Sequence, residues 1–434
     1  MINKLLKNAT VKNAGWIIAG RLIQMLISLV VGLLSARYLG PSNYGLINYA
    51  SAYTAFFMAF CTLGINSLLV KEFVDHPEEE GKIIGSALAL RAISSFLSAG
   101  VIIAIVCIVD ADEPTTIAVA ALYTIGLIFQ IFETFNYWFQ SKLKSKVTAI
   151  VGLVSYMVMA AYKIALLAFG KSVLWFAFAT SLEHICVGVL LLIMYRHYGG
   201  KRLEYSKEVS RRILSKSVYF ILPGLMVAIY GYSDKLMLKH MLSQTEVGYY
   251  STATTIAGLY SFVLTAIIDS VYPSVMSAWN VSKEQFENRN RQLYAVVFYV
   301  AFGFSLLLCI FGEIIVVILY GKSYLDAVQP LRIVTWYTAF SYLGVARNAW
   351  IVCEDKQRYL KYIYCSSAIC NVILNLILIP RGGASGAAAA TLITQITTVF
   401  VVPFFIKPLR RNSVLMLEAV ALKGIKKGKT TDRI

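Results

Sequence analysis

The chain of 434 residues is 58% hydrophobic and 15% charged, with a mean hydropathy of +0.67. These values lie outside the range of soluble globular proteins and predict a protein embedded in a membrane. The net charge of +17 would suggest a nucleic-acid partner in a soluble protein. Here the Lys and Arg residues crowd every second gap between apolar stretches, so we exclude nucleic acid and assign the charge to membrane topology.

Twelve apolar stretches are each long enough to cross a bilayer, which takes about 20 residues. They are continuous rather than alternating in polarity, which favours helices over the strands of a membrane barrel. In chain order, we expect spans near 14–38, 44–70, 82–109, 114–139, 145–169, 172–195, 214–240, 247–273, 291–320, 328–352, 359–380 and 384–409. The predicted fold class is an all-α polytopic membrane protein with twelve transmembrane helices.

The gaps rich in Lys and Arg mark the cytoplasmic side of a multi-pass protein. On this assignment both termini are cytoplasmic and the outer loops are short. The longest polar segment is the basic loop 196–213, in the middle of the chain. The acidic segment 75–80 faces the same side, and the sequence assigns it no partner.

Two weak internal repeats predict that the chain is duplicated. Residues 37–45 are similar in sequence to residues 240–248, and the pair Trp138 and Lys144 recurs as Trp350 and Lys356. An even number of spans per half keeps both halves in the same orientation, as a parallel repeat. We therefore expect a six-helix N-terminal half at 1–200, a basic cytoplasmic linker at 201–213, a six-helix C-terminal half at 214–409 and a basic cytoplasmic tail at 410–434.

The cysteines and histidines predict no metal site and no disulfide framework. None of the seven Cys residues forms a C-x-x-C pair, and His is scarce at four. The short outer loops leave no room for a catalytic domain, so we expect neither a catalytic residue nor a cofactor.

Four sequence motifs carry a family resemblance. Residues 371–391, which hold Asn375, Pro380 and a Gly/Ala-rich stretch, look like the eleventh-to-twelfth helix signature of polysaccharide exporters. The further motifs stand at 38–45, 137–140 and 319–332. Together they resemble bacterial O-antigen flippases of the multidrug/oligosaccharidyl-lipid/polysaccharide exporter superfamily. The resemblance implies two helical halves around a central cavity that is lined by spans 1, 2, 7 and 8.

A polar stripe on the first span is the leading candidate for that cavity. Arg21, Gln24 and Ser28 are spaced three and four residues apart, so they share one face of an otherwise apolar helix. A charge at the centre of a span costs about 2.5–3.5 kcal/mol or more unless it is paired or hydrated, so the stripe is predicted to face the interior. The alternative is that the long side chain of Arg21 extends to the cytoplasmic interface and places its charge in water. This alternative does not explain why Gln24 and Ser28 lie on the same helical face.

The other cavity-lining spans supply aromatic, charged and hydroxyl groups, namely Tyr49, Tyr53, Tyr230, Asp234, Lys235, Thr265 and Asp269. Asp269 is predicted to pair with Arg21, either in the cavity or as a purely structural ion pair. Further charged candidates are Arg91, Lys163, Arg332 and Arg347. For each of these four we favour a structural partner, among Glu133, Glu183 and Glu313, over contact with substrate.

Two neutral polar side chains within spans receive structural predictions. Asn375 is placed to bridge helices through its amide. His184 is favoured as a helix-bridging hydrogen bond over a proton relay.

The resemblance implies transport of an undecaprenyl-diphosphate-linked O-antigen or polysaccharide repeat unit. The unit would pass from the cytoplasmic to the outer leaflet of the bacterial inner membrane by alternating access of the two halves. The implied partners are the lipid-linked (polyprenyl diphosphate) oligosaccharide, the lipid bilayer and other polysaccharide-assembly membrane proteins. Two alternatives stay open: a cation-coupled exporter of drugs or other lipid-linked precursors in the same superfamily, and a membrane-embedded glycan polymerase or acyltransferase.

Overall fold

The computed structural model describes the backbone of residues 9–424, and the side chains of that range except 9–23, 26, 67, 218–220, 222 and 223. Every element described within this range is helical. Helices satisfy all their own backbone hydrogen bonds, which a lipid environment without water requires. The all-α class predicted from the sequence is confirmed.

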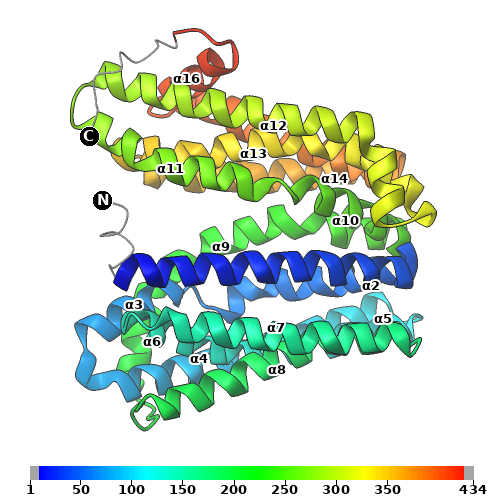
Figure 1. The fold of residues 1–434 in the computed structure, drawn as a ribbon, viewed down its shortest axis with the longest axis vertical. Helices are drawn as coiled ribbons and strands as arrows, with labels where there is room; N and C mark the ends of the chain where they lie inside the picture. The colour runs from blue at the N-terminus through cyan, green and yellow to red at the C-terminus, as the bar shows by residue number, and fades with distance from the viewer. Residues whose placement is uncertain (1–8, 425–434) are drawn as a thin grey trace. The chain divides into compact units, whose positions relative to one another are not determined.

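The first half of the chain forms seven α-helices and two short 3₁₀ turns within the described range (Figure 1). They are α2 (Ala9–Cys61), α3 (Asn66–Asp75), η1 (Pro77–Glu79), α4 (Glu80–Val109), α5 (Pro114–Phe129), η2 (Gln130–Glu133), α6 (Thr134–Ser141), α7 (Ser145–Ala168) and α8 (Val173–His197). The element α2 contains two predicted spans. They are separated by a turn at Gly40, where the backbone is not helical, with φ of 70° and ψ of 171°. Glycine adopts a positive φ without steric cost, and Pro41 follows it at once.

The second half of the chain begins with one long helix and ends with a short amphipathic one. Its elements are α9 (Lys207–Met241), α10 (Gln244–Gly258), α11 (Ser261–Trp279), α12 (Lys283–Leu319), η3 (Lys322–Ala327), α13 (Val328–Cys353), η4 (Gln357–Tyr359), α14 (Leu360–Ile396), the π turn η5 (Thr397–Val401), α15 (Val402–Phe405) and α16 (Arg410–Val420). α14 also covers two predicted spans. Its turn lies at Gly383, with φ of 54°, three residues after Pro380, where the sequence predicts the end of the eleventh span.

The chain divides into two compact units, Met1–Tyr232 and Ser233–Ile434. The boundary falls inside α9, so this helix contributes its first part to one unit and its last part to the other. In the first unit, α2 packs against α4, α5 and α7, and α5 packs against α8. In the second unit, α12 packs against α11, α13 and α16, and α13 packs against α10 and α14 (Figure 1).

Seven helical segments of the described chain are long and apolar enough to cross a membrane. The segment Gln357–Phe405 contains two predicted spans, on either side of the turn in α14. Large apolar side chains stand exposed on several of the seven, with Ile108 exposed by 78% and Phe405 by 81%. Surfaces of that kind are unfavourable in water and match a hydrocarbon environment, so the chain is a multi-pass membrane protein.

Two segments that the sequence treats as polar connections contain helix. α9 begins at Lys207, inside the basic loop, and α16 begins at Arg410, at the start of the basic tail. α16 buries Leu415, Met416 and Ala419 against the second unit. These segments therefore contribute to packing as well as to charge.

Candidate functional site

The most extensively hydrogen-bonded carboxylate of the described spans is Asp234, on α9. Its side chain is 3% exposed and lies within the second unit. It accepts hydrogen bonds from the amides of Asn371 (3.0 Å) and Asn375 (2.5 Å), and from the hydroxyls of Tyr250 (2.5 Å) and Thr391 (2.7 Å). The donors come from α10 and from both arms of α14, so this carboxylate joins three helices.

The side chains that hydrogen-bond to Asp234 are hydroxyl and amide groups. Ser233 adds a hydrogen bond to the side-chain oxygen of Asn371 at 2.8 Å, and the side-chain oxygen of Asn375 is buried with no hydrogen-bond partner. Such oxygen groups are able to hold a proton or a hard cation. Among the residues that the structure describes, no group of three or more His, Cys, Asp or Glu is placed to hold a metal ion. The helix-bridging role predicted for Asn375 is confirmed.

Tyr49 and Tyr53 lie inside the first unit. They are 0% and 5% exposed, and their rings meet edge to face at 5.0 Å between centroids. The hydroxyl of Tyr49 donates to Asp110 at 2.7 Å and contacts the hydroxyl of Tyr53 at 3.2 Å. In this conformation the two tyrosines present almost no surface to a ligand.

The remaining cavity candidates differ in exposure. Gln24, Tyr230 and Lys235 are half-buried, whereas Ser28, Thr265 and Asp269 are exposed. Thr265 is held locally by a hydrogen bond to the carbonyl of Ser261 at 3.1 Å. The side chain of Arg21 lies outside the described residues, and so does the predicted pair between Arg21 and Asp269.

The four further cations occupy different environments. Arg91 and Arg347 are buried, at 3% and 4% exposed, whereas Lys163 and Arg332 are half-buried. Arg332 donates to the carbonyl of Cys309 at 3.3 Å. Two guanidinium nitrogens of Arg347 are buried with no hydrogen-bond partner. Within the described part of the chain, none of the four cations forms an ion pair with Glu133, Glu183 or Glu313.

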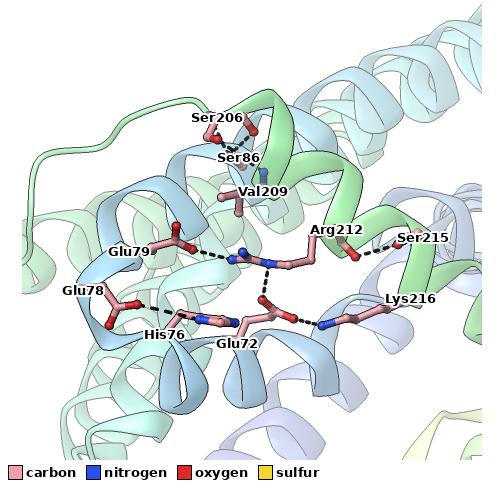
Figure 2. Close-up of polar contacts among 10 residues, drawn as sticks. All are labelled: Glu72, His76, Glu78, Glu79, Ser86, Ser206, Val209, Arg212, Ser215 and Lys216. Carbon is pink, nitrogen blue, oxygen red and sulfur yellow. Dashed lines mark hydrogen bonds and ion pairs between the residues drawn. The ribbon is translucent and has the colours of Figure 1, made fainter.

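A carboxylate cluster on the predicted cytoplasmic side joins α3 and η1 to the start of α9 (Figure 2). Glu72, which is 1% exposed, binds Arg212 at 3.0 Å and Lys216 at 2.8 Å. Arg212 also binds Glu79 at 2.6 Å, and this hydrogen bond is the main reason that the pKa of Arg212 is raised above its ordinary value. All three ion pairs lie within the first unit.

Backbone contacts extend this attachment into the connection that precedes α9. Ser86 donates to the carbonyl of Ser206 at 3.1 Å, and the amide of Glu204 donates to the carbonyl of Gly81 at 3.1 Å. A Cβ atom at Gly81 would lie 2.2 Å from the carbonyl oxygen of Arg202, so glycine is needed for this close approach. These pairings were not predicted from the sequence. The available signal was the acidic segment at 75–80 and the basic loop 196–213 on the same predicted side of the membrane.

Similarity to solved structures identifies the fold. The structure resembles the lipid II flippase MurJ in an inward closed conformation, with a TM-score of 0.72 and 16% identity, covering 95% of this chain and 93% of that one. It also resembles an inward-facing multidrug resistance MATE family transporter of the MOP superfamily, with a TM-score of 0.66 and 16% identity, covering 90% and 95%. The chain has the fold of these multi-pass membrane transporters.

Sequence comparison then gives the family. A family model described as polysaccharide biosynthesis protein matches residues 10–279, and the chain belongs to this family. The capsular polysaccharide biosynthesis protein CapF of Staphylococcus aureus is 20% identical over 414 residues, covering 92% of this chain and 99% of CapF. A putative O-antigen transporter of Escherichia coli (strain K12) is 19% identical over 308 residues, covering 69% and 72%. The resemblance predicted from the four motifs is confirmed.

Proposed function

We propose that this protein flips an undecaprenyl-diphosphate-linked O-antigen or polysaccharide repeat unit from the cytoplasmic to the outer leaflet of the bacterial inner membrane. The observation that carries the proposal is the polysaccharide biosynthesis family match over residues 10–279 on a transporter fold. Relatives named as an O-antigen transporter and a probable glycan biosynthesis flippase support the same class of cargo.

The physical task is to move sugars and a diphosphate past hydrocarbon. Each polar group buried without a partner costs roughly 2–7 kcal/mol, and a charge costs far more. A hydrated cavity between two helical halves removes most of this cost by supplying replacement hydrogen bonds. In this proposal Arg21 and Lys235 bind the diphosphate, whereas Gln24, Tyr230 and Thr265 contact the sugars. Alternating access by rocking of the halves exposes the cavity to one side at a time.

The decisive experiment uses purified full-length protein in vesicles with a fluorescent polyprenyl-diphosphate oligosaccharide. We expect protein-dependent transfer between leaflets, measured by quenching of the outer-leaflet label. Arg21→Gln should abolish transfer, and Arg21→Lys should keep part of it. Arg289→Gln, at an exposed position in the first part of α12, should leave transfer unchanged. Equal transfer in Arg21→Gln and in the natural sequence would remove Arg21 from the proposal.

A second candidate function is export of cationic drugs, favoured by the similarity to the MATE family transporter. The two proposals predict opposite substrate charge. Protein-dependent movement of a cationic dye, without movement of the diphosphate lipid in the same vesicles, would favour the drug exporter.

A further inference from the structure

A small polar cavity lies inside the first unit, where α2, α4 and the 3₁₀ turn η2 meet. Its volume is about 10 Å³, enough for one water molecule. Its polar lining includes Thr62, Arg91, Ser95, Gln130 and Glu133. Arg91 and Glu133, two residues of opposite charge type at the depth of the spans, therefore face the same space, and such residues are functional candidates by default.

The guanidinium of Arg91 has neutral partners only. It donates to the side-chain oxygens of Asn66 and Thr134, the latter at 3.2 Å, and lies 5.7 Å from the ring centroid of Tyr137. Its Nε atom is buried with no hydrogen-bond partner. The charge of Arg91 is thus not balanced by direct contact with any described carboxylate.

The local backbone explains why Gln130 and Glu133 share the cavity. Span 4 is interrupted by η2 (Gln130–Glu133), between α5 and α6. In a 3₁₀ turn the side chains at positions i and i+3 lie on the same side, so the turn brings the amide and the carboxyl together. A 3₁₀ stretch within a helix often marks a functional hinge.

The cavity leaves two buried polar atoms open, Nε of Arg91 and the side-chain oxygen of Gln130, and neither has a hydrogen-bond partner. A water molecule placed there would accept from Nε of Arg91 and donate to Gln130. Its second hydrogen would be free for the carboxylate of Glu133, which gives about three bonds, the usual number for a buried water. The amide nitrogen of Gln130 contacts Nε2 of His184 at 3.1 Å, which confirms the helix-bridging role predicted for His184.

We propose that Glu133 is a proton-binding site of the first half, paired with Arg91 through a single water, and that flipping is linked to its protonation. The linkage rests on the proposed function, whereas the proton site itself does not. Glu133 accepts a proton from hydronium, giving a carboxylic acid and water, and no other bond changes. Protonation neutralises Glu133, which is the only carboxylate among the described residues that line the cavity, so the charge of this cluster rises by one.

Two opposing effects act on Glu133: removal from water favours its neutral form, and the guanidinium favours its charged form. The other titratable groups around η2 come from the helices that pack on it or line the cavity, namely Arg91 on α4, Tyr137 on α6, Cys61 on α2 and His184 on α8. Only Glu133 among them is a carboxylic acid. Its protonated form therefore has a distinct carbonyl absorption.

Infrared difference spectroscopy of the full-length protein in lipid, between acidic and neutral buffer, tests the proton site directly. We expect a carboxylic acid band that disappears in Glu133→Gln and persists in Glu183→Gln, a half-buried carboxyl on α8 that does not line the cavity. Glu133→Asp keeps the carboxyl and should shift the band. A spectrum in which Glu133→Gln leaves the band unchanged, or in which the natural protein shows no band, would overturn the proposal.

Flipping in vesicles with an imposed proton gradient tests the linkage. The natural protein should be faster with the gradient than without it, and Glu133→Gln should have equal rates in both conditions. A Glu133→Gln variant that still responds fully to the gradient would remove the linkage. If no variant flips under any condition, the proposed function fails, while the infrared result still decides the proton site.

Discussion

Arg212 on α9 and Glu72 on α3 form an ion pair of 3.0 Å across 140 residues of sequence, and the carboxylate of Glu72 is almost fully buried. Lys216 binds the other carboxylate oxygen at 2.8 Å. The start of α9 is therefore attached to α3 by one carboxylate and two cations.

Replacing Glu72 with Gln should lower the stability of the protein. The amide keeps the shape but removes the charge that Arg212 and Lys216 share, and hydrogen bonds to charged groups contribute roughly 1.5–3 kcal/mol. Both cations are partly exposed and recover some hydration, so we expect the lower end of that range. Thermal unfolding in detergent measures the change in stability. Glu208→Gln is the control, because Glu208 is an exposed glutamate on α9, the helix that carries Arg212 and Lys216. Equal melting temperatures for the two variants would contradict the prediction.

Gly85→Ala should displace the connection before α9 from the surface of α4. A Cβ atom there would lie 2.2 Å from the carbonyl oxygen of Glu204 and 2.8 Å from its amide nitrogen, both backbone atoms that do not yield easily. Overpacking of this kind costs roughly 1–3 kcal/mol. Faster protease cleavage between residues 199 and 206 is the readout. Gly303→Ala on α12, where a Cβ meets nothing within 4 Å, should leave cleavage unchanged.

Asp234→Ala should be the more damaging of two substitutions at this position. Alanine removes the acceptor that four buried donors share, and each buried group left unsatisfied costs about 1–3 kcal/mol. Thr391 and Asn375 keep a second acceptor, in the carbonyl of Ala387 and the side-chain oxygen of Asn371. Asp234→Asn keeps one oxygen acceptor, so we expect a smaller loss. The yield of monodisperse protein and its melting temperature provide the measurement. Asp269→Ala, at an exposed position, is the stability control, and a loss there as large as in Asp234→Ala would refute the ranking.

The tail helix α16 should contribute to folding. Leu415 is 0% exposed, so Leu415→Ala should cost about 2–5 kcal/mol, the usual range for leucine truncated in a core. Leu417 is 47% exposed, and Leu417→Ala should cost far less. Unfolding measured for both variants gives the comparison. Equal effects would mean that α16 does not pack as described.

The helices were predictable from the sequence because hydrophobic periodicity and span length are local properties. Each predicted span overlaps described helix, although the spans 44–70 and 247–273 each contain a helix break. The turn near Pro380 was missed by only three residues. The partners of Asp234 were not predictable. Asn371 lies 137 residues away in sequence and Thr391 lies 157 residues away, and a single chain carries no local signal for pairs at such separation.

In the candidate site, too, local features were predictable from the sequence and contacts between distant residues were not. Tyr49 and Tyr53 fall on one helical face, which the sequence shows, but their burial against Asp110 depends on how α2 packs. The 3₁₀ turn that brings Gln130 beside Glu133 contains no Gly or Pro, so the sequence gives no sign that the helix is interrupted there. The cavity at Arg91 was therefore visible only in three dimensions.

The connection that joins α8 to α9 is held in place along its length. Its carbonyls rest on glycines of α4, and its first helical turns are held by Glu72 and Glu79. A chain segment fixed in this way cannot lengthen without breaking these contacts, so the first turns of α9 and the surface of α4 form one rigid piece within the first unit.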